Sequence, residues 1–439
     1  MSENHNKENA FEQLDHDVLK AMGKPSLWYW LALAISSFFF AAGMAAWAYL
    51  VYTGFWPTGL NNPVGWGVLI TNFVFWVGIA HSGTLISAVL FLFRAKFRSR
   101  FNRAAEAMTV IAVSTAGLFP LIHLGRLWIF YFLMPYPNQR QLWPNFRSPL
   151  LWDVFAINAY LILSSIFFYV GMIPDLAIVR RNSTGIRKWI YAIFSLGWRG
   201  TNEQWKHYSQ VYIFLAALAT PLVISVHSIV SWDFAMSVVP GWHTTIFAPY
   251  FVAGAIFSGI AMVMTLMIPM RKIFSLEKYI TADHFESLAK ILLFTSLIVG
   301  YSYIVEFMLA FYSGNIFEEA IFKYRLTGHY KFLYGMMILC NVLLPLLLFK
   351  KSLRRNLFFL FGLSIFVNIG MWLERFVIIV TSLAHEYQPY AWGTYTPQPV
   401  EIIITLGSFG MFFTLFLIFL KVLPVLAITE IKETMVAEH

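Results

Sequence analysis

The stretch AMTVIAVSTAGLFPLIHLGRLWIFYFLM (residues 107–134) carries only two basic side chains, His123 and Arg126, in a long apolar run. Roughly 20 apolar residues cross a bilayer core of about 30 Å as an α-helix, so this stretch is long enough to span a membrane. Similar runs occur throughout the chain and are continuous rather than alternating, which argues against a β-barrel. The sequence therefore predicts an all-α polytopic membrane protein of about ten transmembrane helices. The expected spans lie near 27–52, 64–93, 107–134, 150–179, 208–230, 244–269, 287–312, 329–349, 354–380 and 400–424.

The composition excludes an ordinary soluble domain. Of the 439 residues, 59% are hydrophobic and 12% are charged, against about 25% charged residues in a typical soluble domain. The single cysteine, Cys340, argues against a disulfide framework and a thiolate metal site. The chain has no CxxCH motif, which excludes covalently attached haem c. The polar N-terminus does not resemble a cleavable signal peptide.

Basic residues are distributed unevenly between the two sides of the predicted helices. The segments on the side of the termini, with Lys421 included, hold 23 Lys and Arg residues, whereas the opposite connections hold four. Positive charge marks cytoplasmic loops, so both termini are predicted to be cytoplasmic. This topology accounts for the net charge of +9 and leaves no reason to expect nucleic acid as a partner. On the outer side, the proline-rich connection PYPNQRQLWPNFRSP (135–149) is predicted to be a lid or a docking surface.

A faint internal repeat favours two four-helix bundles, formed by spans 2–5 and 6–9 and flanked by spans 1 and 10. In this repeat, HLGRLWIFYF (123–132) aligns with YIVEFMLAFY (303–312). The expected organisation is a cytoplasmic tail, a flanking helix, the two bundles, a second flanking helix and a cytoplasmic tail. The corresponding ranges are 1–26, 27–52, 64–230, 244–380, 400–424 and 425–439.

Ionisable side chains inside membrane spans are costly and indicate function by default. Residues three apart share a helix face, so His123 and Arg126 are predicted to lie together at the outer end of span 3. Asp153, just inside the outer end of span 4, follows across one outer connection. This trio suits a quinol, which loses two protons and two electrons, because His and Asp can each accept one proton. An ordinary helix-to-helix salt bridge between Arg126 and Asp153 remains the alternative.

Other buried polar groups leave a choice between a proton path and a structural role. His227, Glu306, Glu374 and Arg375 are predicted to lie in the outer half, and His81 near the middle. Glu306, Glu374 and Arg375 could instead form an ion pair that holds spans 7 and 9 together. Small polar residues near His81 could support a water chain or allow close helix packing.

Three segments resemble the NrfD/polysulfide-reductase family of membrane subunits, and more narrowly the quinol-binding ActC-type subunit of bacterial alternative complex III. They are NFVFWVGIAHSGTLISAVLFLFR (72–94), AGLFPLIHLGRLWIFYFLMPYPN (116–138) and SPLLWDVFAINAYLILSSIFFYVGMIPDLA (148–177). The resemblance implies menaquinol oxidation near the outer face, with His123 and Asp153 in the positions of the family's pocket residues. Arg126 and Tyr160 are added as quinol-binding residues from geometry, since Tyr160 lies two helical turns below Asp153.

The resemblance also implies a location and a set of partners. The expected location is the bacterial inner membrane, and the expected partners are an outer iron–sulfur subunit, multihaem cytochrome c subunits, a paralogous NrfD-like subunit and a terminal oxidase. This chain itself would hold no haem or iron–sulfur cluster. The alternatives are a structural membrane anchor, an ion-translocating subunit or transporter, and a cytochrome b-type carrier that uses His81, His123 and His227. Coupling of quinol oxidation to proton translocation is a further hypothesis.

Overall fold

The computed structural model describes residues 2–133 and 146–437, and within these ranges all regular secondary structure is helical. Ten helical segments are long and apolar enough to cross a membrane, which confirms the predicted all-α polytopic fold. They are Leu27–Thr53 (α2), Val68–Leu92 (α3, η1, α4), Asn102–His123 (α5), Pro149–Arg181 (α6), Asn202–Ala235 (α8), Phe247–Ile273 (α9), Ala282–Tyr312 (α10), Lys331–Phe349 (α12, η4, α13, η5), Leu357–Ala384 (α15, η6, α16) and Pro399–Val422 (α17).

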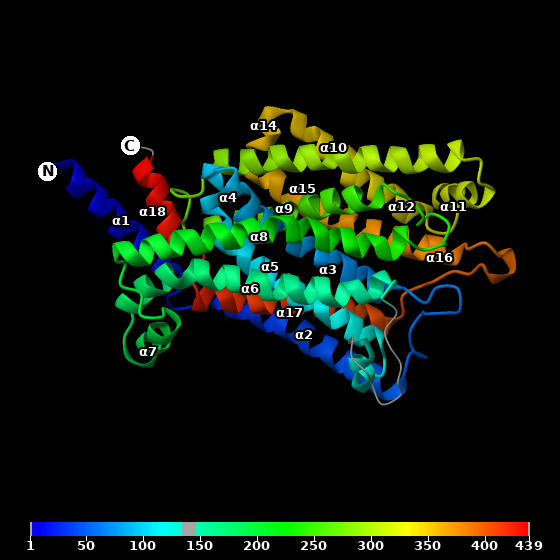
Figure 1. The fold of residues 1–439 in the computed structure, drawn as a ribbon, viewed down its shortest axis with the longest axis horizontal. Coiled ribbons are helices and arrows are strands. Elements are labelled where there is room, and N and C mark those ends of the chain that lie inside the picture. Colours follow the sequence, from blue (N-terminus) through cyan, green and yellow to red (C-terminus); the bar gives the residue numbers. More distant parts are fainter. Residues whose placement is uncertain (1, 134–145, 438–439) are drawn as a thin grey trace.

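Shorter helices and the connections define two ends of the molecule. The end that carries both termini is called the tail face, and it includes α1 (Ser2–Ala21), α7 (Gly185–Phe194) and α18 (Ile428–Ala437) (Figure 1). The opposite end is called the loop face, and α11 (Ile316–Thr327) lies there. The predicted topology corresponds to a cytoplasmic tail face and an outer loop face.

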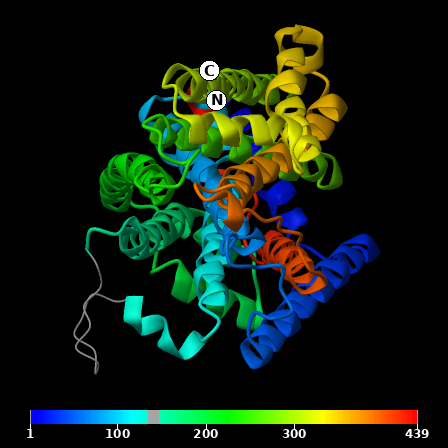
Figure 2. The same ribbon diagram turned by 90° about the vertical axis from the view of Figure 1, so that its right-hand side faces the viewer.

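Helix α3 forms the centre of the packing, and almost every one of its residues is buried. It packs on α5 and α8, which with α6 form one group of helices, and on α9, which with α10, α12 and α15 forms another. Helices α2 and α17 pack on each other beside these groups, and α17 also contacts α5 (Figure 2).

Three π-helical turns interrupt the long helices, namely η1 (Leu85–Val89), η4 (Leu339–Leu343) and η6 (Val377–Thr381). Each lies beside buried polar side chains, since Thr84, Asn341 and Glu374 are within or close to them. A π turn widens the helix locally and often occurs at functional sites. The hydropathy pattern contained no indication of these turns.

The third span differs from its expected range of 107–134. Helix α5 begins earlier, at Asn102, and ends at His123. Gly125 then adopts a φ of +67°, a conformation that glycine accepts readily, and a separate 3₁₀ helix covers Leu127–Leu133. The predicted lid at 135–149 lies largely outside the described residues.

Candidate functional site

The loop-face end of α5 presents His123 in a mostly buried setting. Pro120 lies inside this last turn, and the N–H of Leu124 donates to the Pro120 carbonyl at 3.0 Å as the helix ends. The His123 ring lies 6.1 Å from the ring of Phe55, measured between centroids. Its Nδ1 is buried and has no hydrogen-bond partner among the described residues. This nitrogen is therefore placed to accept a bond from a ligand.

Two carboxyl groups face each other at the same end of the first helix group. Asp153 lies near the start of α6, and its carboxyl interacts with that of Asp233 near the end of α8. One oxygen of each, Oδ1, is buried and has no hydrogen-bond partner within the described part of the chain. The rings of Trp152 and Trp232 pack edge to face beside the pair, 6.0 Å apart. Two carboxyl groups in contact can share one proton, so this pair can act as a proton acceptor.

Arg126 does not join His123 and Asp153 on a common helix face, so this part of the prediction is wrong. The helix stops at His123, and the turn at Gly125 separates Arg126 from it. Arg126 is exposed, and no ion pair connects it to Asp153 among the described residues. The carboxyl that Asp153 meets belongs to Asp233, which sequence analysis missed because it assigned residue 233 to an outer connection.

Beneath the loop face, His81 forms the centre of a buried aromatic and hydroxyl cluster. Its ring lies 4.5 Å from the ring of His227 and stacks on Tyr160 at 5.0 Å, between centroids. The Tyr160 hydroxyl donates to the Ala80 carbonyl at 2.9 Å and lies 2.8 Å from Thr84 Oγ1. The structure thus joins three residues that sequence analysis had singled out, His81, His227 and Tyr160. Tyr160 is buried in this cluster rather than beside the Asp153–Asp233 pair.

The small residues near His81 serve helix packing as well as hydrogen bonding. Ser82 packs directly against Gly259 of α9, where a larger residue would collide with its side chain. Thr109 of α5 donates to the Ala80 carbonyl at 2.7 Å. Close packing and a continuous series of hydroxyl groups therefore coexist here.

The second helix group buries a different polar cluster around Glu374. Arg375 Nη1 lies 2.8 Å from Glu374 Oε1, and both side chains are almost completely buried. The Tyr303 hydroxyl donates to the same carboxylate and accepts a bond from Asn341 Nδ2 at 3.0 Å. The ion pair thus lies within α15 instead of linking spans 7 and 9, and Tyr303 is the residue that connects them. This corrects the structural alternative from the sequence.

Glu306 lies at the edge of a loop-face cavity of about 550 Å³. The cavity is bordered by the end of α8, the end of α10 and the start of α11, and Glu318 also lines it. The Glu318 carboxylate accepts a bond from the Gly241 N–H at 2.9 Å. Burial raises the pKa of Glu318, and this bond together with the charge of Arg325 offsets part of the rise. Two acidic groups therefore face one cavity on the predicted outer side.

A further network of buried charges at the tail face was not predicted. Arg103 forms ion pairs with Glu106 and Asp175, each at 2.8 Å, and all three side chains are at most 2% exposed. Arg98 pairs with Glu430 of α18 at 3.0 Å. Sequence analysis treated the arginines as topogenic loop charges because it began the third span at residue 107. The i, i+3 spacing of Arg103 and Glu106, and the single acid in the apolar run GMIPDLAIV (171–179), were the signals available.

Ten packed spans with ionisable groups buried at several depths define an integral membrane protein built to handle protons. Among the described residues no cluster of His, Cys, Asp and Glu is arranged to hold a metal ion. The profile of the family described as "Polysulphide reductase, NrfD" matches residues 56–385. The chain therefore belongs to the NrfD family of membrane subunits.

Curated relatives are membrane subunits of redox complexes. The C-type membrane subunit of a putative dimethyl sulfoxide reductase from Halobacterium salinarum is 27% identical over 398 residues, covering 85% of this chain and 86% of the relative. The C-type component of selenate reductase from Mesobacillus selenatarsenatis is 25% identical, covering 80% and 81%. An Hdr-like menaquinol oxidoreductase integral membrane subunit from Archaeoglobus fulgidus is 25% identical over 112 residues, 26% of this chain and 27% of the relative. The chain is accordingly a membrane subunit of an oxidoreductase complex.

Proposed function

We propose that this protein is the quinol-oxidising membrane subunit of a respiratory complex of the alternative complex III type, with menaquinol as substrate. The observation that carries the proposal is the loop-face group of His123, Asp153 and Asp233, which offers buried and unpaired proton acceptors from three helices. Menaquinol also appears in the name of one relative. Arg126 and Tyr160 remain proposed quinol-binding residues.

The reaction removes two protons and two electrons from the quinol. His123 Nδ1 accepts the proton of one hydroxyl group, and the Asp153–Asp233 pair accepts the proton of the other. The two electrons pass to an iron–sulfur cluster of a partner subunit at the loop face and then to multihaem cytochrome c subunits. A terminal oxidase and a paralogous NrfD-like subunit complete the proposed assembly. The protons leave on the outer side because the acceptors lie at that end of the bundle.

A second component of the proposal is proton translocation through the first helix group. The tail-face network, the hydroxyl groups of Thr109, Thr84 and Tyr160, and the His81–His227 pair succeed one another between the two faces. Hydroxyl and imidazole groups can pass protons along such a series. The series extends toward the second group, because the guanidinium of Arg375 lies 4.3 Å from the Phe251 ring, which in turn lies 5.8 Å from the His227 ring.

An alternative follows from the two reductase relatives. In a complex of that kind the same quinol site would supply electrons to a terminal reductase instead of a cytochrome chain. A pure membrane anchor is a third possibility, and it predicts that quinol turnover survives the loss of the acceptors.

The decisive experiment measures quinol:acceptor activity of the assembled complex carrying Asp153→Asn or His123→Phe, after checking that every protein of the complex is present. General acid–base groups typically contribute about 10²- to 10⁴-fold to rate, so a loss in that range is expected for an intact complex. Glu203→Gln, an exposed change at the other end of α8, is the matched control. Full activity in both acceptor variants would contradict the proposal.

A further inference from the structure

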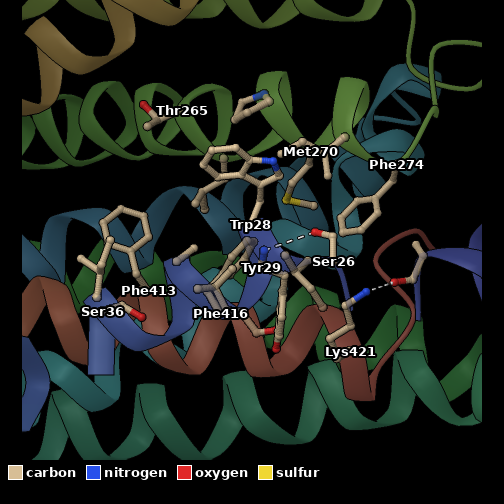
Figure 3. Close-up of a pocket in the computed structure, with 18 of the residues that line it drawn as sticks. Ser26, Trp28, Tyr29, Ser36, Thr265, Met270, Phe274, Phe413, Phe416 and Lys421 are labelled. Carbon is tan, nitrogen blue, oxygen red and sulfur yellow. Dashed lines mark hydrogen bonds between the residues drawn. The ribbon is translucent and has the colours of Figure 1, made fainter. Parts of the chain in front are cut away.

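The largest cavity in the described structure is a groove of about 1040 Å³ between α2, α9 and α17 (Figure 3). It begins at the tail face, where the link between α1 and α2 closes it, and runs along the three helices toward mid-membrane. Its volume is at the upper end of the range for small-molecule sites, about 300–1000 Å³. The groove is therefore large enough for a large amphiphile.

The walls of the groove are held by close helix packing. Gly43 of α2 lies against Gly407 of α17, where a Cβ on Gly43 would stand 2.6 Å from the Gly407 Cα. Thr414 of α17 donates to Ser36 of α2 at 3.0 Å, and the Tyr29 hydroxyl donates to the Leu417 carbonyl at 3.0 Å. The groove is thus a fixed feature of the α2–α17 pair.

Charge is confined to one end of the groove. Three lysines line it at the tail face, namely Lys20, Lys24 and Lys421. Lys421 donates to the Ala21 carbonyl at 2.8 Å, whereas Lys20 and Lys24 are exposed. The acidic residue of the lining, Asp17, accepts a bond from the Tyr279 hydroxyl at 2.9 Å. This end therefore presents a positive surface with ammonium donors.

The remainder of the groove is apolar and aromatic. Phe39 of α2 and Phe409 and Phe413 of α17 line it away from the lysines. Figure 3 shows Ser26 and Lys421 gathered at one end, with Phe413 toward the other. A cationic end followed by an apolar channel is complementary to a molecule with an anionic head and hydrocarbon chains.

We propose that this groove binds an anionic phospholipid, with its phosphate beside Lys20, Lys24 and Ser26 and its acyl chains along the aromatic wall. Basic pockets between transmembrane helices on the cytoplasmic side typically bind such head groups. The N-terminus of α2 adds backbone N–H groups at the same place, since Ser26 is the N-cap of that helix. A quinol fits less well, because the head-group end offers ammonium donors and its carboxylate is already bonded.

The bound lipid has a structural consequence. It contacts α1, the α2–α17 pair and α9 at once, and so joins the flanking helices to the second helix group. The assignment does not depend on the proposed quinol chemistry.

The test is native mass spectrometry of the purified full-length protein, in its complex, after exchange into nanodiscs of phosphatidylglycerol or phosphatidylcholine. The expected result is selective retention of phosphatidylglycerol by the wild type. The double variant Lys20→Gln/Lys24→Gln should bind it on the order of thirtyfold more weakly, since each lysine near a lipid phosphate contributes substantially. The control Lys188→Gln/Lys206→Gln changes two exposed lysines of the tail face that do not line the groove.

A second variant protects the test against loss of folding through charge removal. Ala32→Trp places a bulky ring on the exposed, groove-lining face of α2, and should displace phosphatidylglycerol while all three lysines remain. Quinol:acceptor activity is expected to persist in every variant, which separates this test from that of the quinol site. Equal retention of both lipids, equal retention in the two double variants, or a quinone or a partner's helix found in the groove would each overturn the proposal.

Discussion

The Asp153–Asp233 pair concentrates two acidic groups in a place where only one negative charge is easily tolerated. Charges of the same sign repel strongly when water is excluded, so a shared proton stabilises the pair. Oxidation of a quinol supplies protons to such a site, and release toward the loop face restores it. The pair is therefore best understood as one proton-accepting unit in which both members are required.

This interpretation makes a prediction for Asp233→Asn. The variant keeps the shape of the side chain but removes one proton acceptor, so quinol oxidation should fall by at least about tenfold with the complex intact. The measurement is steady-state quinol:acceptor activity, compared with Glu203→Gln near the first turn of the same helix. Unchanged activity in Asp233→Asn would assign the pair to packing alone.

Glu318 provides a pH test outside the spans. Burial raises the pKa of its carboxyl above the ordinary value of 4.5. A raised pKa means that the stability contributed by the protonated form is lost as pH rises through the folded-state value. Glu318→Gln keeps an acceptor for the Gly241 N–H and cannot ionise. The variant should therefore gain thermal stability relative to the wild type as pH increases over this range.

Thermal unfolding scans of the purified protein at a series of pH values give the measurement. Glu319→Gln, at the neighbouring position of α11, is the control for loss of one negative charge. A difference in Tm between Glu318→Gln and the wild type that stays constant with pH would contradict this role for burial.

At the scale of elements, the C-terminal helix α18 is attached to the bundle by charges and hydrogen bonds. Glu430 receives bonds from Asn102 Nδ2 at 2.8 Å and from the Tyr212 hydroxyl at 3.1 Å, and the Thr429 N–H donates to Asp175 at 3.0 Å. Helices α5, α6, α8 and α18 thus meet at one polar centre. Satisfied networks of this kind fix a single arrangement of the helices.

Removing the central cation should disrupt this arrangement. Arg103→Gln leaves Glu106 and Asp175 buried without their common partner, and breaking a buried ion pair in this way typically costs about 3–5 kcal/mol. The expected result is a lower unfolding temperature and lower yield of the assembled protein. Arg187→Gln, on the exposed part of α7, is the control. A stability equal to the wild type would show that the network contributes little.

The contact between α2 and α17 gives an independent test of packing. A side chain on Gly43 would collide with the backbone of Gly407, and overpacking typically costs about 1–3 kcal/mol. Gly43→Leu should therefore lower the unfolding temperature or separate the two helices. Gly362→Leu is a matched control, because nothing lies within 4 Å of a Cβ at that position. Similar stabilities for the two variants would contradict the observed close approach.

For the whole molecule, the sequence was sufficient for the number and order of the spans because hydropathy over about 20 residues measures the bilayer directly. It also identified His81, Glu306 and Glu374, since ionisable residues in apolar runs are rare. It failed where a local break or a boundary decides the result. The turn at Gly125 lies inside continuous apolar sequence, and Arg103, Asp175 and Asp233 lie near the ends of spans, where charge is ordinary. Contacts such as Asp153–Asp233 depend on tertiary packing that no local pattern records.

The arrangement of polar groups across the whole thickness of the bundle leads to a prediction about energy coupling. His227 contacts His81 and lies beside Phe251, so it joins the proposed series in the first helix group to the second. His227→Phe preserves an aromatic ring but cannot carry a proton. Quinol oxidation at the loop face should continue, because its acceptors are unchanged, whereas proton uptake from the tail face should stop.

The measurement uses the complex in proteoliposomes and records protons released and electrons transferred together. Oxidation of the quinol alone releases protons in fixed proportion to electrons, and any translocated protons add to that ratio. The wild type should exceed the ratio of the chemical reaction, and His227→Phe should fall to it at comparable turnover. Thr220→Val, a change of similar size on α8 at a hydroxyl that bonds only within its own helix, should keep the wild-type ratio. If His227→Phe and the wild type release the same number of protons per electron, the His81–His227 pair has a packing role, and the protons released come from the quinol or from another route.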